Sequence, residues 1–165
     1  SPYFCLSDLA QHWPSNDASA RREVIMITDG VDYYDPRYDP EDPYLLKAIA
    51  DSVRANLVVY SIYWKGAGRA AQSGYETNAG QNLLSQVTAA TGGQSWWMGY
   101  GNPVSLVPYF DDFSERLQNQ YELGYLAPLH GKAQIESLKV KVSARNLKVT
   151  SPQKTYVAPA GPNPR

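Results

Sequence analysis

VIMITDG, residues Val24 to Gly30, carries the clearest structural signal in this 165-residue chain. Its first five residues are apolar or β-branched, a pattern typical of a strand buried on both faces of a sheet. Asp29 and Gly30 follow at once, so the strand ends by presenting a carboxylate. The acid at the tip of a core strand is the first candidate for a functional side chain.

Composition places the chain among single globular domains. The mass is 18.3 kDa, 43% of the residues are apolar and 19% are charged, which allows a sizeable core and excludes disorder. A formal net charge of -1 gives no basis for binding nucleic acid or an anionic membrane surface. No apolar run approaches the roughly 18 residues of a membrane helix. Cys5 is the only cysteine, so no intrachain disulfide can form, and we expect it to be a small core residue.

Helices and strands are expected to alternate up to residue 119. Strands are predicted at residues 23–28, 57–63 and 94–98, helices at 6–13, 44–55, 79–91 and 104–119, and loops at 31–43 and 64–78. The helices follow apolar residues spaced three or four apart, and Gly92-Gly93 supplies a left-handed cap. A helix-containing segment joins each pair of strands, so the strands should be parallel, with helices on both faces of the sheet.

The pattern changes after residue 119. Residues 121–126, 135–144 and 147–157 alternate like antiparallel strands, with a hairpin turn at His130. Residues 158–165 are rich in Pro and Gly and are expected to be a flexible tail. The predicted organisation is an α/β unit over residues 1–119, an antiparallel β extension over 120–157, and the tail.

Four segments, in order, resemble a von Willebrand factor type A domain. They are VIMITDG (24–30), NLVVYSIY (56–63), NLLSQVTAATGGQSWWM (82–98) and YELGYLAP (121–128). The ending, QYELGYLAP followed by IESLKVKVSARNLKVTSPQKTYVAP, is similar to a bacterial, acidobacterial-type subgroup of that family. The resemblance implies a parallel, Rossmann-like sheet of which this chain supplies the C-terminal half, and a secreted or periplasmic location.

The resemblance also implies a metal-ion-dependent adhesion site at the carboxyl end of the sheet, where the strand order reverses. Asp29 falls on one position of that site, and Ser1 lies near the position of a family threonine. The D-x-S-x-S motif of the site would precede residue 1. DASAR (17–21) and DFSER (112–116) do not replace it, because Arg21 and Arg116 occupy the final serine position.

Mg²⁺ takes six oxygen ligands, so Asp29 alone cannot hold it. We therefore expect Mg²⁺ or another divalent cation to bind only when the D-x-S-x-S segment is supplied. The alternative is that Asp29 caps its own turn by accepting backbone N–H groups.

Other polar residues give weaker signals. The acidic loop Asp32, Asp35, Asp39, Glu41 and Asp42 offers calcium ligands, although its spacing fits no EF-hand and a solvated loop is the alternative. Asp8 and His12 are spaced for an acid–imidazole pair on one helix, which we interpret as a surface pair. There is no nucleophile elbow, P-loop, dinucleotide fingerprint or zinc cluster, so we expect no enzyme.

Three functions remain open. The favoured one is a protein-binding or adhesion module; the alternatives are an architectural assembly domain with no metal site, and a metal-assisted hydrolase using Asp29. Expected partners are a protein ligand, an N-terminal segment, or a second copy pairing at the Val24–Thr28 edge. Such an edge carries unpaired N–H and C=O groups that invite another strand.

Overall fold

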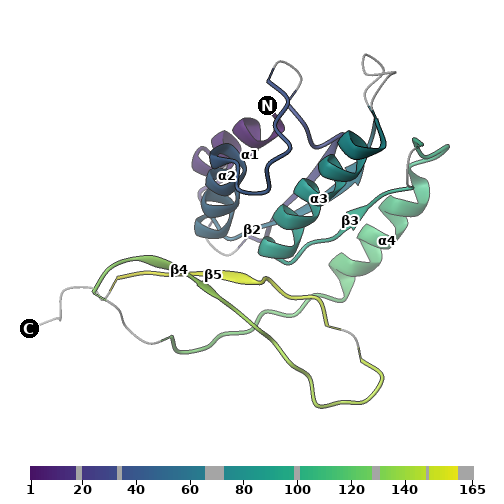
Figure 1. Cartoon of the computed structure of the whole chain (residues 1–165). Coiled ribbons are helices and arrows are strands. Elements are labelled where there is room, and N and C mark those ends of the chain that lie inside the picture. The colour runs from purple at the N-terminus through teal and green to yellow at the C-terminus, as the bar shows by residue number, and fades with distance from the viewer. Residues whose placement is uncertain are drawn as a thin grey trace, which may run out of the picture.

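The computed structural model of the chain describes residues 1–17, 20–32, 35–65, 73–98, 101–127, 131–147 and 149–159. The elements follow in the order α1 (Pro2–Gln11), β1 (Arg22–Thr28), α2 (Pro43–Arg54), β2 (Leu57–Tyr63), α3 (Gly74–Thr91), β3 (Ser95–Trp96), α4 (Val107–Gln118), β4 (Gln134–Ser137) and β5 (Lys154–Val157) (Figure 1). The fold is α/β, with a three-stranded sheet flanked by helices and a separate two-stranded sheet. Among the described helices, none is long and apolar enough to cross a membrane.

The larger sheet has the order β1-β2-β3, and both pairs are parallel, which confirms the prediction. β1 pairs with β2 over its whole length, from Arg22↔Leu57 to Thr28↔Tyr63. β3 has only two residues, so the strand predicted over residues 94–98 is too long. The chain leaves the sheet after Trp96, and Met98 forms an isolated antiparallel bridge to Gly101.

Capping residues decide where the helices begin, and they correct two predicted boundaries. The Ser1 hydroxyl accepts the Phe4 N–H, so α1 begins at Pro2 rather than at residue 6 and ends at Gln11. Ser73 and Glu76 form a reciprocal capping box, so α3 begins at Gly74 instead of residue 79. Gly92 ends α3 with φ 86°, the left-handed cap that the sequence predicted.

The core lies between the sheet and helices α1, α2 and α3. Val24 and Met26 of β1 and Leu57 and Val59 of β2 pack against apolar residues of these helices: Leu6, Leu45, Ile49, Leu83 and Val87. Each fully buried aliphatic side chain contributes about 1.5–3 kcal/mol of transfer free energy. This burial is what holds the carboxyl ends of the strands in place.

Helix α4 packs on the opposite face of the sheet, against Tyr60 of β2. Tyr60 follows the core residue Val59, and successive residues of a strand face opposite sides of the sheet. The Tyr60 ring stacks on Trp96 at 5.9 Å and meets the edge of Phe113 at 4.8 Å. No residue of α4 is fully buried, so the predicted apolar face of this helix is only half covered. α4 is also shorter than predicted, at Val107–Gln118 instead of residues 104–119.

The C-terminal extension differs most from its prediction. Its strands are β4 and β5, of four residues each, instead of residues 135–144 and 147–157, and residues 121–126 form no strand. Alternation predicts a strand only where a partner lies alongside, and Tyr121, Leu123 and Leu126 are 93%, 70% and 101% exposed. The turn predicted at His130 and the tail from residue 160 lie outside the described residues.

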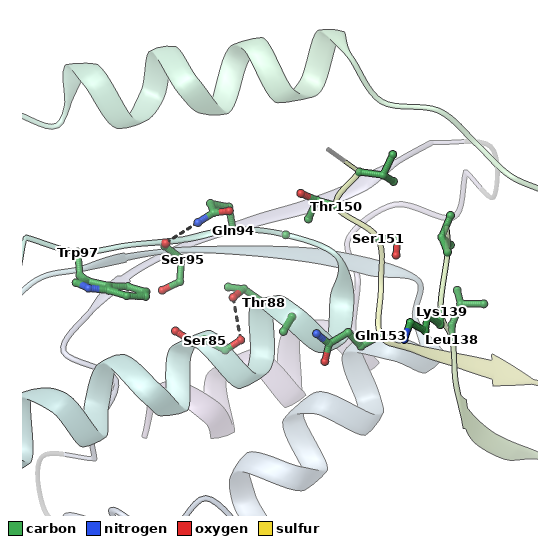
Figure 2. A pocket seen from close by; sticks show the side chains of 14 residues that line it. Ser85, Thr88, Gln94, Ser95, Trp97, Leu138, Lys139, Thr150, Ser151 and Gln153 are labelled. Carbon is green, nitrogen blue, oxygen red and sulfur yellow. Dashed lines mark hydrogen bonds between the residues drawn. The ribbon is translucent and has the colours of Figure 1, made fainter. Parts of the chain in front are cut away.

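Residues 131–147 and 149–157, here called the C-terminal arm, join the α/β unit at the C-terminal end of α3. The Gln153 N–H donates to the Ala89 carbonyl at 3.0 Å, and Ile135 packs against the core. The arm leaves a groove of about 400 Å³ against α3 and β3, lined by residues such as Thr88, Trp97, Leu138 and Val140 (Figure 2).

Candidate functional site

Asp29 lies directly after β1, at the carboxyl end of the parallel sheet, as the sequence predicted. One carboxylate oxygen accepts the Val31 N–H at 3.2 Å, and the Thr28 hydroxyl accepts the Gly30 N–H at 3.2 Å. Gly30 has φ 74°, a conformation that glycine adopts without strain. The alternative in which Asp29 caps its own turn is therefore confirmed.

Helix α3 supports this turn from beneath. Gly80 belongs to α3, and a β-carbon on it would lie 2.1 Å from the carbonyl oxygen of Asp29. Gly30 in turn lies against the Gly80 carbonyl and Leu84. The lack of side chains at these two positions lets the turn and the helix approach to backbone contact.

The N-terminal end of α1 meets the same end of the sheet. The Tyr3 hydroxyl donates to the Gly30 carbonyl at 2.7 Å, and the Ser1 amino nitrogen lies 3.3 Å from an Asp32 carboxylate oxygen. The Ser1 hydroxyl caps α1 by accepting the Phe4 N–H. Ser1 therefore contacts the loop that follows Asp29, and it does so through Asp32.

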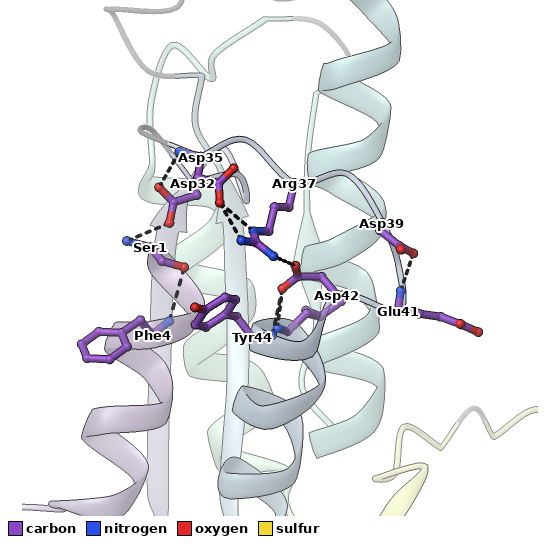
Figure 3. A network of polar contacts seen from close by, with 10 residues as sticks. Ser1, Phe4, Asp32, Asp35, Arg37, Asp39, Glu41, Asp42 and Tyr44 are labelled. Carbon is purple, nitrogen blue, oxygen red and sulfur yellow. Dashed lines mark hydrogen bonds and ion pairs between the residues drawn. The ribbon is translucent and has the colours of Figure 1, made fainter.

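The acidic loop is held by its own ion pairs (Figure 3). Arg37 donates to Asp35 at 2.6 Å and to Asp42 at 3.2 Å, and its guanidinium lies 5.1 Å from the Tyr44 ring centre. Asp42 also caps α2 by accepting the Tyr44 and Leu45 N–H groups. Asp39 accepts the Glu41 N–H at 2.8 Å.

These contacts surround a pocket of about 350 Å³. Its lining combines polar and aromatic residues: Ser1, Tyr3, Phe4, Asp32, Asp35, Arg37, Asp42 and Tyr44, with Leu45 and Leu83 at its base. Burial raises the pKa of Tyr3, and the negative charges of Asp29 and Asp42 raise it further. The Tyr3 hydroxyl is thus a neutral donor at the edge of an acidic pocket.

The described residues do not by themselves fit a metal ion. They contain no group of three or more His, Cys, Asp or Glu side chains arranged to hold one. One oxygen of Asp29 already accepts the Val31 N–H, whereas an octahedral Mg²⁺ requires several oxygens. A metal centre at Asp29 would need ligands from elsewhere.

The other polar residues singled out in the sequence lie on the surface. Asp8 and His12 pair at 3.2 Å with side chains 63% and 71% exposed, as expected for a surface pair. Cys5 is exposed, which corrects its predicted place in the core. It follows Phe4, which is 61% exposed.

Sequence reasoning missed two buried carboxylates. Asp51, 8% exposed, joins α1 to α2 by accepting hydrogen bonds from Ser7 at 2.6 Å and Gln11 at 2.8 Å and by pairing with Lys47 and Arg54. Its spacing four residues after Lys47 was the available signal. Both carboxylate oxygens of Glu23 are buried and lack a well-formed hydrogen bond within the described part of the chain.

No family model, curated protein or solved structure matches the chain in the comparisons made. The resemblance to von Willebrand type A domains therefore stays a prediction that rests on the four sequence segments.

Proposed function

We propose that the chain is a non-catalytic protein-binding module of the adhesion type, which contacts its ligand at the carboxyl end of β1. The observation that carries this proposal is the meeting of three segments around one pocket: the start of α1, the Asp29 turn and the acidic loop. Carboxyl ends of strands in open α/β sheets are where ligands bind. Exposed rings of Phe4 (61%) and Tyr44 (49%) beside the pocket suit contact with a protein surface.

The proposal also includes a more specific assignment of the fold than the α/β class. The three parallel strands are consistent with the C-terminal half of a Rossmann-like type A sheet, in which β1 would have a further strand on its open side. Ile27 is 45% exposed on that strand. A protein ligand, an N-terminal segment or a second copy would then be the partner at the Val24–Thr28 edge. The family resemblance supports a secreted or periplasmic location.

The proposal includes binding of a divalent cation on one condition, the presence of a D-x-S-x-S segment. With a D-x-S-x-S segment supplied, Asp29 would become one ligand of Mg²⁺ or Mn²⁺, and binding of the protein ligand would depend on the metal. Without that segment, the Asp29 carboxylate serves its own turn.

Calorimetric titration with Mg²⁺ and Mn²⁺ tests this condition, on the chain itself and on a polypeptide that also carries the segment. We expect binding only in the second, and its loss in Asp29→Asn. Asp39→Asn, in the neighbouring loop, is the matched control and should retain binding. Equal titrations of the extended Asp29→Asn and the unsubstituted polypeptide would refute a role for Asp29 in holding metal.

The second candidate is an architectural assembly domain with no metal site. It is favoured by the many exposed apolar residues of the C-terminal half, which include Leu123 (70%), Leu147 (67%) and Val149 (49%). Absence of metal binding in both polypeptides, together with self-association of the chain, would favour this candidate.

A further inference from the structure

Charge is divided unequally along the chain. Residues 1–119 carry 14 acidic and 8 basic side chains, whereas residues 120–157 carry 2 acidic and 6 basic ones. The near-neutral total of -1 therefore conceals an acidic α/β unit and a basic extension. Such asymmetry indicates an electrostatic partner for each part.

The two charged regions lie at opposite ends of the molecule (Figure 1). The acidic end surface consists of loop residues 29–32 and 35–42 with the neighbouring rings of Phe4 and Tyr44, at the carboxyl ends of the strands. Six acidic residues and one basic residue, Arg37, fall within that loop. The C-terminal arm is attached at the other end, where α3 terminates.

The arm is basic on the side that faces solvent. Leu138 and Val140 are partly buried and line the groove against α3 and β3. Lys139 and Lys141 are exposed, Lys139 at the rim of the same groove. Arg145 is exposed in the turn at the far end of the arm. Val142, Leu147 and Val149, which flank this turn, are 44%, 67% and 49% exposed. The arm therefore presents cations together with uncovered apolar side chains.

The acidic end surface has the complementary character. Asp35, Asp39 and Glu41 are exposed, and the pocket beside them is lined by carboxylates and by the rings of Phe4 and Tyr44. The arm and the acidic end surface lie at opposite ends of one molecule, so contact between them joins two copies of the chain. Charge complementarity combined with apolar contact is what a specific interface requires.

We propose that the chain associates with itself head to tail, the tip of the C-terminal arm of one copy docking on the acidic end surface of the next. The contact joins two different surfaces, so repeated contacts generate a ring or an open chain of subunits. This association is independent of the metal-dependent binding proposed above, and it differs from pairing at the β1 edge because it depends on charge.

Sedimentation velocity of the whole chain, in the presence of chelator, tests the proposal. We expect the sedimentation coefficient to rise with protein concentration at about 0.02 M salt and to fall to that of a monomer at about 0.5 M salt, where exposed charges are screened. A monomer at every concentration in low salt would overturn the proposal.

Charge-reversal variants test whether the arm and the acidic end surface form the head-to-tail contact. The arm variant Lys141→Glu/Arg145→Glu and the end-surface variant Asp35→Lys/Glu41→Lys should each weaken association at least about tenfold. Placing all four substitutions in one chain restores opposite charges, with exchanged sign, at the four substituted positions and should recover part of the association. Asp111→Lys/Glu115→Lys changes the net charge as much as the end-surface variant does, but on exposed positions of α4, and should associate as the unsubstituted chain does.

Ile27→Lys separates this contact from pairing of β1 edges. It places a charge on the edge strand β1, which disfavours pairing with another strand, and should leave the salt-sensitive association unchanged. Association that persists at high salt and disappears in Ile27→Lys would overturn the head-to-tail contact in favour of edge pairing. Circular dichroism of each variant confirms that it is folded before it is compared.

Discussion

The hydroxyl of Tyr3 donates a 2.7 Å hydrogen bond to the carbonyl oxygen of Gly30, 27 residues later in the sequence. This bond fastens the first turn of α1 to the turn that carries Asp29. Tyr3 is only 5% exposed, so an unpaired hydroxyl or carbonyl here would be costly. The geometry of the candidate site therefore depends on a side chain that the strand motif alone does not reveal.

Tyr3→Phe should lower the free energy of unfolding by about 1–2 kcal/mol, because it leaves the Gly30 carbonyl without its donor. Urea unfolding followed by circular dichroism measures the change. Tyr75→Phe, at a side chain 70% exposed, is the matched control and should have almost no effect. Equal stability of the two variants would show that the Tyr3 bond contributes little.

Gly80→Ala should destabilise the chain by about 2 kcal/mol or more, although Gly→Ala within a helix ordinarily stabilises by up to about 1 kcal/mol. The added β-carbon would lie 2.1 Å from the Asp29 carbonyl oxygen, which forces the turn and α3 apart. Thermal unfolding measures the loss. Gly124→Ala, where a β-carbon meets nothing within 4 Å, serves as the control. A stabilised Gly80→Ala variant would contradict backbone contact between the turn and α3.

Asp51 should make the free energy of unfolding depend on pH at low pH, between about 4 and about 2. Burial alone would raise the pKa of Asp51, but hydrogen bonds from Lys47, Ser7 and Gln11 and the charge of Lys47 outweigh burial and lower the pKa to about 2. A carboxyl whose pKa is lower in the folded chain stabilises it above the unfolded pKa of about 3.8, and this contribution is lost as the pH falls from about 4 to about 2.

Urea unfolding at several pH values measures this contribution. We expect it to be about 1–2 kcal/mol, reduced by the solvent exposure of Lys47 and Arg54, and to be missing in Asp51→Asn. The exposed Asp111→Asn should retain the full pH dependence between 4 and 2. An Asp51→Asn curve parallel to that of the unsubstituted chain would exclude Asp51 as its source.

Ionisation of Glu23 should destabilise the folded chain, whereas ionisation of Asp51 stabilises it. Burial raises its pKa, opposed by the neighbouring Gln120, Arg21 and Tyr60 side chains. A carboxyl whose pKa is raised on folding destabilises the chain as the pH rises through and above the unfolded value of 4.5. Glu23→Gln should therefore increase stability at pH 7 and leave it unchanged or lower at pH 3. Lower stability of this variant at pH 7 would mean that the ionised carboxylate is well solvated or paired.

Amide exchange along β1 should alternate. The Thr28 carbonyl accepts the Trp64 N–H at 2.9 Å, so Val24, Met26 and Thr28 direct their backbone groups to β2, and Ile25 and Ile27 direct theirs away. Hydrogen exchange read by NMR should show slow amides at Met26 and Thr28 and fast ones at Ile25 and Ile27. Slow exchange at all four would mean that another strand covers the edge.

Local patterns were enough to predict the α/β unit. The apolar runs at residues 23–28 and 57–63 and the helical spacing at 44–55 fall within one residue of β1, β2 and α2. The helix between each pair of strands also predicted their parallel direction correctly. These features follow from the sequence because buried strands and amphipathic helices have their own periods, and a crossover connection leaves one direction for the next strand.

Some predictions were wrong because they were made from a local sequence pattern, whereas strand pairing and burial depend on distant segments. Residues 121–126 alternate like a strand but form no strand in the structure, and Cys5, predicted to be a core residue, is exposed. Strand pairing and burial depend on which segment lies alongside. That information is distributed over the whole chain and is not carried by the segment itself.

The order of helices and strands in the α/β unit and the place of Asp29 at the tip of β1 follow from local sequence patterns. Three features became visible only in the folded chain: Tyr3, Ser1 and Asp32 gather around that tip, Asp51 joins α1 to α2, and the basic arm lies opposite the acidic loop. The difference comes from the distance along the sequence over which each kind of interaction acts. Secondary structure is set by backbone preferences and periodicity over a few residues, whereas these contacts join residues 27 to 44 positions apart and form only once the common core has brought them together.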